Sequence, residues 1–364
     1  MTVSMRSLFL LVLALAAPGL ARAEDNQLNI INWADYIAPD IIPEFEKRTG
    51  IKVVYDTFDS DAALEAKLMA GGTAYDLVTT STSYFARQIR AGVYLELDRS
   101  KLPNWKNLDQ EVLAIEARYD PNNAHGMPYL RGTNGFAYNV DTVKAIMPDA
   151  PVDSLDMLFK PEIVSKFKDC GVTLLDSPED VMQIALSYLH LDPNSTKPED
   201  YDKAAEMLLK IKPYIRAFDS EQYLSGLPNK EVCIAMSWSA DYETARARAR
   251  AAGLDVNLAF TVPKEGANAW FDAWFIPKAA PHPEAAHKFL DFMLEPEIIA
   301  RVTNLTHYAN DNAASTPFVH PDILGDPAIY PTPEIRQRLY YAEEVSAPTE
   351  RIRTRAWTRV KTGT

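Results

Sequence analysis

Five short clusters of aromatic, hydroxyl and acidic residues follow, or lie on, segments that the sequence predicts to be β-strands. They occupy residues 33–36 (WADY), 81–84 (STSY), 176–180 (DSPED), 238–241 (WSAD) and 270–272 (WFD). Three of them place a carboxylate close to an aromatic ring, and a fourth supplies carboxylates alone. Because open α/β sheets bind ligands outside the carboxyl ends of their strands, we expect these clusters to meet at one binding site.

The chemistry of these side chains suits a small molecule with more than one amine, such as a polyamine. A terminal ammonium needs an anionic partner, because a buried charge without one costs several kcal/mol. Ring faces attract cations by about 0.5–2 kcal/mol per contact. Each cluster alone also has a structural explanation: Trp33 or Trp270 in the core, Asp180 at a helix N-terminus, and Asp241 as a helix cap. Their repetition at equivalent strand ends favours a binding site.

The sequence contains no short catalytic motif. It lacks the G-x-S-x-G elbow, the H-E-x-x-H zinc motif, the P-loop and the G-x-G-x-x-G dinucleotide motif. Its six histidines show no metal-ligand spacing, so we expect neither a metal site nor a cofactor. Catalytic residues assembled in space would escape this search, but a binding protein is favoured over an enzyme.

The net charge is strongly negative. The 364 residues include 37 Lys and Arg against 50 Asp and Glu, a formal net charge of −13 at pH 7. Arg6 and Arg22 lie in a predicted signal segment without acids, so the mature chain has 35 basic and 50 acidic residues, near −15. Such a field repels nucleic acid and anionic membranes and concentrates cationic ligands, although acidity also serves solubility alone.

The N-terminus has the layout of a secretory signal peptide over residues 1–23. Arg6 supplies a positive charge, residues 8–15 form an apolar run, and residues 21–23 read A-R-A, so cleavage is expected after Ala23. The run is shorter than the roughly 18 residues of a membrane-spanning helix, and a buried N-terminal helix is the alternative. No Cys follows the run, so we expect an exported protein without a lipid anchor.

The chain has two cysteines, Cys170 and Cys233. In an oxidising compartment an even pair indicates one disulfide, and two free buried thiols are the alternative. A bridge would close a loop of about 63 residues and contribute roughly 4 kcal/mol in the chain-entropy model.

The alternation of β-rich runs with helical stretches predicts an α/β fold. About 340 mature residues exceed the roughly 250–300 at which one core stops growing, so we expect two lobes on either side of residue 132. No linker separates them, which a chain that crosses more than once would explain. The expected strands are 28–33, 53–55, 76–80, 135–139, 172–176, 215–218, 232–237, 258–262 and 269–275, and the expected helices include 39–48, 84–90, 178–190, 198–211, 240–252 and 282–294.

Several segments, in order along essentially the whole mature chain, resemble bacterial periplasmic polyamine-binding proteins of spermidine/putrescine ABC transporters. The resemblance is closest to the putrescine-type receptors. It rests on residues 32–37 (NWADYI), 75–78 (YDLV), 127–129 (MPY) with 132–133 (GT), 138–139 (YN), 262–266 (VPKEG), 270–272 (WFD) and 353–357 (RTRAW).

The resemblance implies a type II periplasmic binding protein fold, with a hinge and a ligand cleft between two α/β lobes. Lobe 1 would comprise residues 28–131 and 258–305, and lobe 2 residues 132–257 and 310–364. The resemblance also implies a monomer in the periplasm that delivers a polyamine to permease subunits in the inner membrane. Cys170 and Cys233 fall where relatives carry a disulfide. The implied ligand-binding residues are Trp33, Asp35, Tyr36, Ser81, Asp180, Trp238, Asp241, Trp270, Asp272 and Tyr308.

Three positions depart from the family pattern, and two of them, Ala34 and Trp270, bear on the choice of ligand. Asp180 stands where glutamate is expected, with Glu179 beside it, so either acid could contact the ligand. Ala34 replaces an expected Ser or Thr, and Trp270 replaces the Phe of putrescine-preferring members. The larger ring gives a slight preference for spermidine, while putrescine stays open. A polyamine sensor that signals through a partner protein, or a receptor for another cationic solute, is the alternative function.

Overall fold

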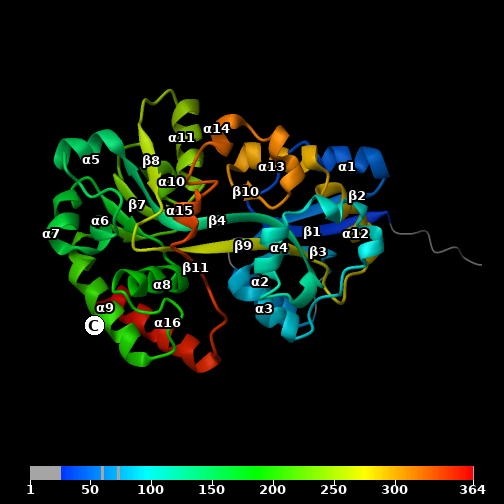
Figure 1. The fold of residues 1–364 in the computed structure, drawn as a ribbon, viewed down its shortest axis with the longest axis horizontal. Coiled ribbons are helices and arrows are strands. Elements are labelled where there is room, and N and C mark those ends of the chain that lie inside the picture. Colours follow the sequence, from blue (N-terminus) through cyan, green and yellow to red (C-terminus); the bar gives the residue numbers. More distant parts are fainter. Residues whose placement is uncertain (1–25, 59–60, 72–73, 364) are drawn as a thin grey trace, which may run out of the picture.

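The computed structural model describes residues 26–58, 61–71 and 74–363 of the chain. Helices surround one mixed sheet that runs through both halves of the molecule (Figure 1). The main path of the sheet has the order β2-β1-β3-β9-β4-β7-β5-β6, with β8, β10 and β11 paired at its sides. The strands are β1 (Gln27–Trp33), β2 (Lys52–Phe58), β3 (Leu77–Ser81), β4 (Gly126–Asn139), β5 (Val172–Leu174), β6 (Ala217–Phe218), β7 (Ile234–Trp238), β8 (Leu258–Thr261), β9 (Ala267–Phe275), β10 (Ala309–Asn310) and β11 (Leu339–Tyr341).

One half of the molecule is built around the parallel strands β2, β1 and β3. Leu28 and Ile30 of β1 are fully buried, as expected for parallel strands covered on both faces. The first helix ends at Gly50, whose φ of 74° is a left-handed cap that glycine adopts without strain. The helices of this half are α1 (Ile41–Thr49), α2 (Asp61–Met69), α3 (Thr82–Arg90), α4 (Gln110–Glu116), α12 (Pro283–Met293) and α13 (Pro296–Thr306).

The other half is built around β7, β5 and β6, with β5 parallel to both neighbours. Its core extends from Phe136 to Leu258 and includes Trp357 and Val360 of the last helix. The helices here are α5 (Val140–Ile146), α6 (Asp156–Phe159), α7 (Pro161–Val164), α8 (Pro178–Tyr188), α9 (Pro198–Ile211), α10 (Tyr223–Gly226), α11 (Asp241–Ala251) and α16 (Ala347–Thr362). The short helices α14 (Pro321–Leu324) and α15 (Pro333–Arg336) lie between α13 and α16 in the chain.

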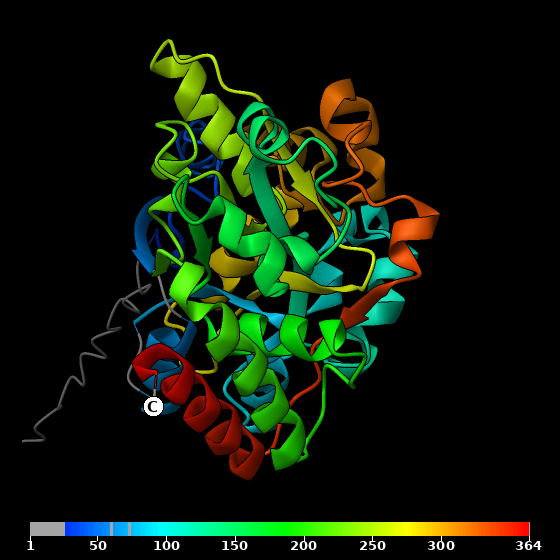
Figure 2. The ribbon, with the colours of Figure 1, turned by 90° about the vertical axis from the view of Figure 1, so that its left-hand side faces the viewer.

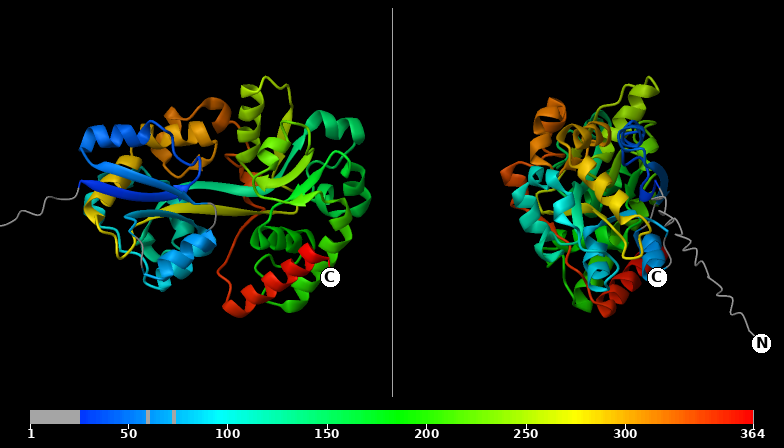
Figure 3. Two further views of the ribbon diagram at one scale, coloured as in Figure 1. Left: turned by 180° about the vertical axis from the view of Figure 1, so that it is seen from behind. Right: turned by 90° about the vertical axis from the view of Figure 1, so that its right-hand side faces the viewer.

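Two long strands, β4 and β9, cross between the halves (Figures 1 and 3). β4 pairs with β9 over residues 126–133 and continues with β7 and β8 over residues 134–139. The sequence predicts only residues 135–139 as a strand, and this extent is wrong because the strand begins at Gly126. Pro128 and the glycines obscure its pattern. Glycine is needed here: a Cβ at Gly132 would lie 2.4 Å from Cζ2 of Trp270.

Cys170 and Cys233 form a disulfide, with their Cα atoms 5.5 Å apart. The pairing predicted from the sequence is therefore confirmed over two free thiols. The two cysteines precede β5 and β7, which are neighbours in the sheet, so the bridge fixes the start of this strand pair.

The predicted boundaries of the lobes stay a prediction. Two large buried cores take in opposite ends of β4, one containing Leu28 to Tyr308 and the other Phe136 to Val360. β8, assigned to lobe 1, pairs with the second half of β4. β11, assigned to lobe 2, pairs with the start of β9.

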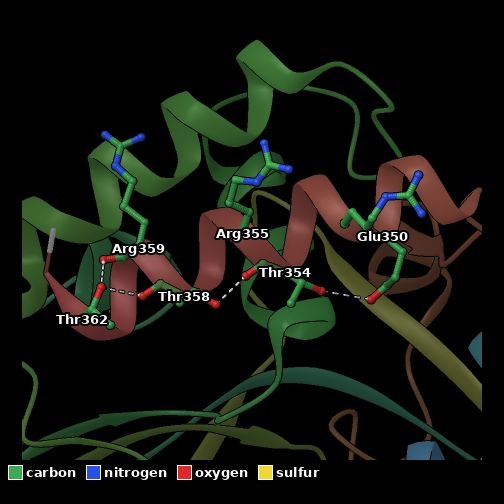
Figure 4. Close-up of a pocket in the computed structure, with 7 residues that line it drawn as sticks. Glu350, Thr354, Arg355, Thr358, Arg359 and Thr362 are labelled. Carbon is green, nitrogen blue, oxygen red and sulfur yellow. Dashed lines mark hydrogen bonds between the residues drawn. The ribbon is translucent and has the colours of Figure 1, made fainter.

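The last helix, α16, packs on α8 and α9 (Figure 2). Its buried Arg353 lies 3.8 Å from Glu179 in the first turn of α8, so α16 supplies a cation to the start of that helix. Its outer face bears a groove lined by Glu350, Arg351, Thr354, Arg355, Thr358, Arg359 and Thr362 (Figure 4).

Candidate ligand-binding site

Asp272 lies on the crossing strand β9 and is only 3% exposed. It pairs with Ser81 of β3 on one side and with Leu130 of β4 on the other. The Tyr36 hydroxyl donates to Oδ2 of Asp272 at 2.8 Å, and Oδ1 has no hydrogen-bond partner within the described residues. Burial raises the pKa of Asp272 to about 6. The carboxylate is thus ionised at neutral pH and keeps one oxygen for a cation.

Asp241 opens α11 in the other half of the molecule. Its two oxygens accept hydrogen bonds from tyrosines, at 2.9 Å from Tyr308 and at short range from Tyr223. Burial raises the pKa of Asp241 to about 6. The residue preceding α11 is Ala240, and no side-chain cap bond is present, so the carboxylate is held by tyrosine hydroxyls rather than by the helix.

Ring contacts connect the two tyrosine-bound carboxylates. The Tyr36 and Tyr308 rings have centroids 5.7 Å apart, and the Trp270 ring lies 5.3 Å from Tyr308. The Trp270 Nε1 is buried without a hydrogen-bond partner among the described residues. The result is a continuous row of Asp272, Tyr36, Tyr308 and Asp241 with Trp270 against it, in which the carboxylates come from both halves.

Asp180 and Trp238 belong to a second group at the same boundary. Asn134 of β4 donates to Oδ1 of Asp180 at 2.6 Å, and Asn134 pairs with Trp238 across β4 and β7. Burial raises the pKa of Asp180, which the hydrogen bond from Asn134 partly offsets. Trp238 packs against both large cores. Glu179 contacts Arg353 instead, so the two adjacent acids have different partners.

Trp33 packs against the core that contains Tyr36 and Tyr308, but within the described residues no hydrogen bond, ion pair or ring contact joins Trp33 or Asp35 to these groups. The Trp33 ring packs 4.2 Å from Phe58, with its Nε1 buried and unpaired within the described chain. Asp35 is exposed at a φ of 54°, and no hydrogen bond or ion pair involves it in the described part. The structure therefore leaves the roles of Trp33 and Asp35 as predictions. Side-chain contacts or strand pairing join the other eight predicted residues into two groups. The first group, around Asp272 and Asp241, comprises Tyr36, Ser81, Asp241, Trp270, Asp272 and Tyr308, and the second comprises Asp180 and Trp238.

Two further residues, Asn134 and Tyr223, contact these groups, a third, Asp61, lies next to them, and all three escape the sequence analysis. Asn134 is a fully buried polar residue in the middle of a strand, a pattern that signals a specific partner. Tyr223 gives no such signal, because buried tyrosines are common. Asp61, at the start of α2, is 9% exposed and accepts a hydrogen bond from Thr80 at 2.9 Å. Its sequence position is typical of an ordinary helix start.

Comparison with known proteins assigns the family. Residues 40–330 match the family described as "Bacterial extracellular solute-binding protein". The chain belongs to this family. It is 48% identical over 347 residues to the putrescine-binding periplasmic protein PotF of Escherichia coli, covering 95% of this chain and 94% of that protein. It is 47% identical over 360 residues to the putrescine-binding periplasmic protein SpuD of Pseudomonas aeruginosa, covering 98% of each.

A solved structure supports the same assignment. The spermidine/putrescine ABC transporter substrate-binding protein PotD from Streptococcus pneumoniae superposes with a TM-score of 0.79 at 28% identity, covering 93% of this chain and 99% of that chain. The predicted periplasmic binding protein fold and the predicted resemblance are confirmed. Family membership also confirms a binding protein rather than an enzyme.

The family is extracellular or periplasmic, in agreement with an exported protein. The predicted signal peptide and its cleavage after Ala23 lie outside the described residues. Within residues 26–58, 61–71 and 74–363, no helix combines the length and hydropathy needed to cross a membrane.

Proposed function

We propose that this protein binds putrescine or spermidine in the periplasm and delivers it to the permease subunits of an ABC transporter. Cleavage after Ala23 would release the mature chain, which we expect to act as a monomer. The observation that carries the proposal is the row of Asp272, Tyr36, Tyr308 and Asp241, which presents a buried carboxylate, Asp272, from one half of the molecule and a half-buried one, Asp241, from the other.

The row suits a diammonium chain for three reasons. Each carboxylate is charged at neutral pH and is kept in place by a tyrosine hydroxyl. The rings of Tyr308 and Trp270 offer apolar surface to methylenes and a negative face to ammonium groups. The relatives named above are putrescine-binding proteins, which favours this ligand class over another cationic solute.

The mechanism we propose is closure of the two halves around the amine. Asp272 lies on β9, and Asp241 lies on α11 beyond the crossing strands. A ligand that bridges the two carboxylates binds the closed arrangement more tightly than the open one, and therefore favours closure. Water leaves as the halves approach, and each ammonium exchanges its hydration for a carboxylate. The closed surface would then be the form that the permease recognises. A sensor role would use the same closure with a different partner.

Titration calorimetry on the refolded, ligand-stripped mature protein tests the ligand. Putrescine, cadaverine, spermidine and spermine should be titrated separately, and one-to-one binding of at least one at micromolar affinity or tighter is expected. Absence of heat with all four, from a protein whose circular dichroism shows it to be folded, would refute polyamine binding and leave the fold intact. Light scattering with and without ligand tests the monomer.

A charge-matched pair of variants tests the residues. Asp241→Asn should weaken binding of the preferred amine by more than about tenfold, because a desolvated ammonium loses its partner. Asp255→Asn removes the same charge from an exposed position after α11 and should leave affinity within about twofold. Equal affinities of both variants would remove Asp241 from the site. Reconstitution with the neighbouring permease, measured as amine uptake, separates transport from sensing.

A further inference from the structure

Asp61 is a buried carboxylate beside the site that none of the assigned roles uses. It is the first residue of α2, 9% exposed, and Thr80 donates a hydrogen bond to its Oδ1 at 2.9 Å. Thr80 precedes Ser81, which pairs with Asp272 across β3 and β9. Asp61 therefore lies at the carboxyl ends of β2 and β3, at the same sheet edge as Asp272.

The surroundings of Asp61 are anionic. The charges that act most strongly on it are those of Asp272 and, from the other half of the molecule, Glu179. Burial, followed by the charge of Asp272, raises the pKa of Asp61 to about 7. Arg87 is engaged elsewhere, with its guanidinium 2.7 Å from Glu65. Within the described residues no cation is paired with Asp61, in a place where one would be strongly stabilised.

A second observation indicates a ligand at this place. Oδ2 of Asp272 is occupied by Tyr36, but Oδ1 is buried and unpaired within the described residues. Ser81 adjoins both acids, since it pairs with Asp272 across β3 and β9 and follows Thr80, which bonds to Asp61. An ammonium on this free oxygen would lie beside Ser81, and the next amine of a longer ligand would then donate to Asp61, since –NH₃⁺ has three donors.

We propose that Asp61 forms a third amine subsite, which makes the protein prefer a triamine such as spermidine over a diamine. The inference rests on the proposed function and deepens it by naming the longer ligand. Asp241 and Asp272 suffice for the two ammoniums of a diamine. A third carboxylate at the sheet edge adds a partner that only an additional amine can use.

The test compares two ligands in matched variants. Asp61→Asn keeps an acceptor for the Thr80 hydroxyl while it removes the charge, and Asp56→Asn removes the same charge from an exposed position on β2. We expect Asp61→Asn to lower the ratio of spermidine to putrescine affinity at least tenfold, measured by calorimetry. Asp61→Glu should restore the ratio to within about threefold of the wild type, and Asp56→Asn should not change it.

A second measurement uses the wild-type fold alone. N1-acetylspermidine has a neutral amide in place of one terminal ammonium, so the wild type should bind it at least about tenfold more weakly than spermidine. This discrimination should vanish in Asp61→Asn. The inference is overturned if the wild type does not discriminate, if Asp61→Asn leaves the affinity ratio unchanged, or if that variant weakens both amines equally. A wild type that binds neither putrescine nor spermidine refutes the proposed function itself, which distinguishes the two failures.

Discussion

Lowering the pH should weaken amine binding by an amount that follows from the burial of two carboxylates. Burial raises the pKa of Asp241 and of Asp272 to about 6 in the free protein. An ammonium interacts favourably with the ionised form only, so binding below that pKa must displace a proton from each group. Affinity is therefore highest above about pH 7 and is lost as the pH falls through about 6.

The magnitude can be worked out for each group. A carboxylate of pKa about 6 is almost fully ionised at about pH 8 and roughly one-eleventh ionised at about pH 5, so it lowers affinity about elevenfold. Two independent groups give a loss on the order of a hundredfold. Primary amines, with a pKa near 10, stay protonated over this range. Asp61 and Glu179 have raised pKa values of about 7 and about 6, and their protonation acts in the same direction.

Calorimetry in two buffers of different ionisation enthalpy measures both the affinity and the protons released. Near pH 6, Asp241 and Asp272 should together release about one proton per bound amine. Asp241→Asn should lower the proton release by about one half and reduce the slope of affinity against pH. Putrescine affinity that stays within about twofold between about pH 8 and pH 5, in a protein that circular dichroism shows to be folded, would refute the assignment of these carboxylates.

Other perturbations separate the contributions of packing, crosslinking and buried charge. Gly132→Ala should displace the Trp270 ring, because the new Cβ would lie 2.4 Å from Cζ2 of that ring. We expect at least tenfold weaker amine binding and a shift in tryptophan fluorescence. An unchanged fluorescence spectrum would contradict the displacement of the ring. Replacing Cys170 and Cys233 together by Ser should lower the free energy of unfolding by about 4 kcal/mol in urea titrations, while a change below about 1 kcal/mol would show that the loop is constrained by other contacts. Glu116 is 3% exposed, and burial raises its pKa well above the usual range, so the favourable neutral form of its carboxyl is lost as the pH rises. Glu116→Gln should therefore raise Tm by about 4 °C near pH 8 and by less near pH 5. Equal gains at both pH values would refute the claim that Glu116 titrates in the folded protein.

Local patterns in the sequence suffice for most helices and for the parallel strands. The helix predicted at 198–211 is α9 with the same ends, because a proline at the first turn and a regular apolar stripe both mark it. Strand β1 follows its buried apolar run. The long strand β4 is largely missed, because its pairing with β9 depends on partners more than a hundred residues away and its glycines fit ring contacts invisible in sequence.

The acidic residues show where prediction of the site fails. Asp35 and Asp61 both follow a strand of the first half, and only Asp35 lies in a recognised motif. The structure leaves Asp35 exposed in a left-handed turn and buries Asp61 against Thr80. Burial is decided by which loop folds over the sheet edge, so residue type and spacing cannot rank the two acids. The sequence names Asp241 and Asp272 as candidates because each lies next to or near a tryptophan at the end or middle of a strong strand pattern, and the structure brings both into one row.

The buried carboxylates also explain why closure would depend on ligand. At neutral pH Asp241 and Asp272 are ionised in surroundings that raise the pKa of both, so an empty closed arrangement holds two charges that hydroxyl groups stabilise only in part. Hydration of these charges favours the open arrangement of the empty protein. In the proposed mechanism, a bound polyamine would remove that opposition by supplying one ammonium to each carboxylate, and its energy of interaction would become the energy of closure. The residues that recognise the amine would thereby also report its presence to whatever partner reads the closed form.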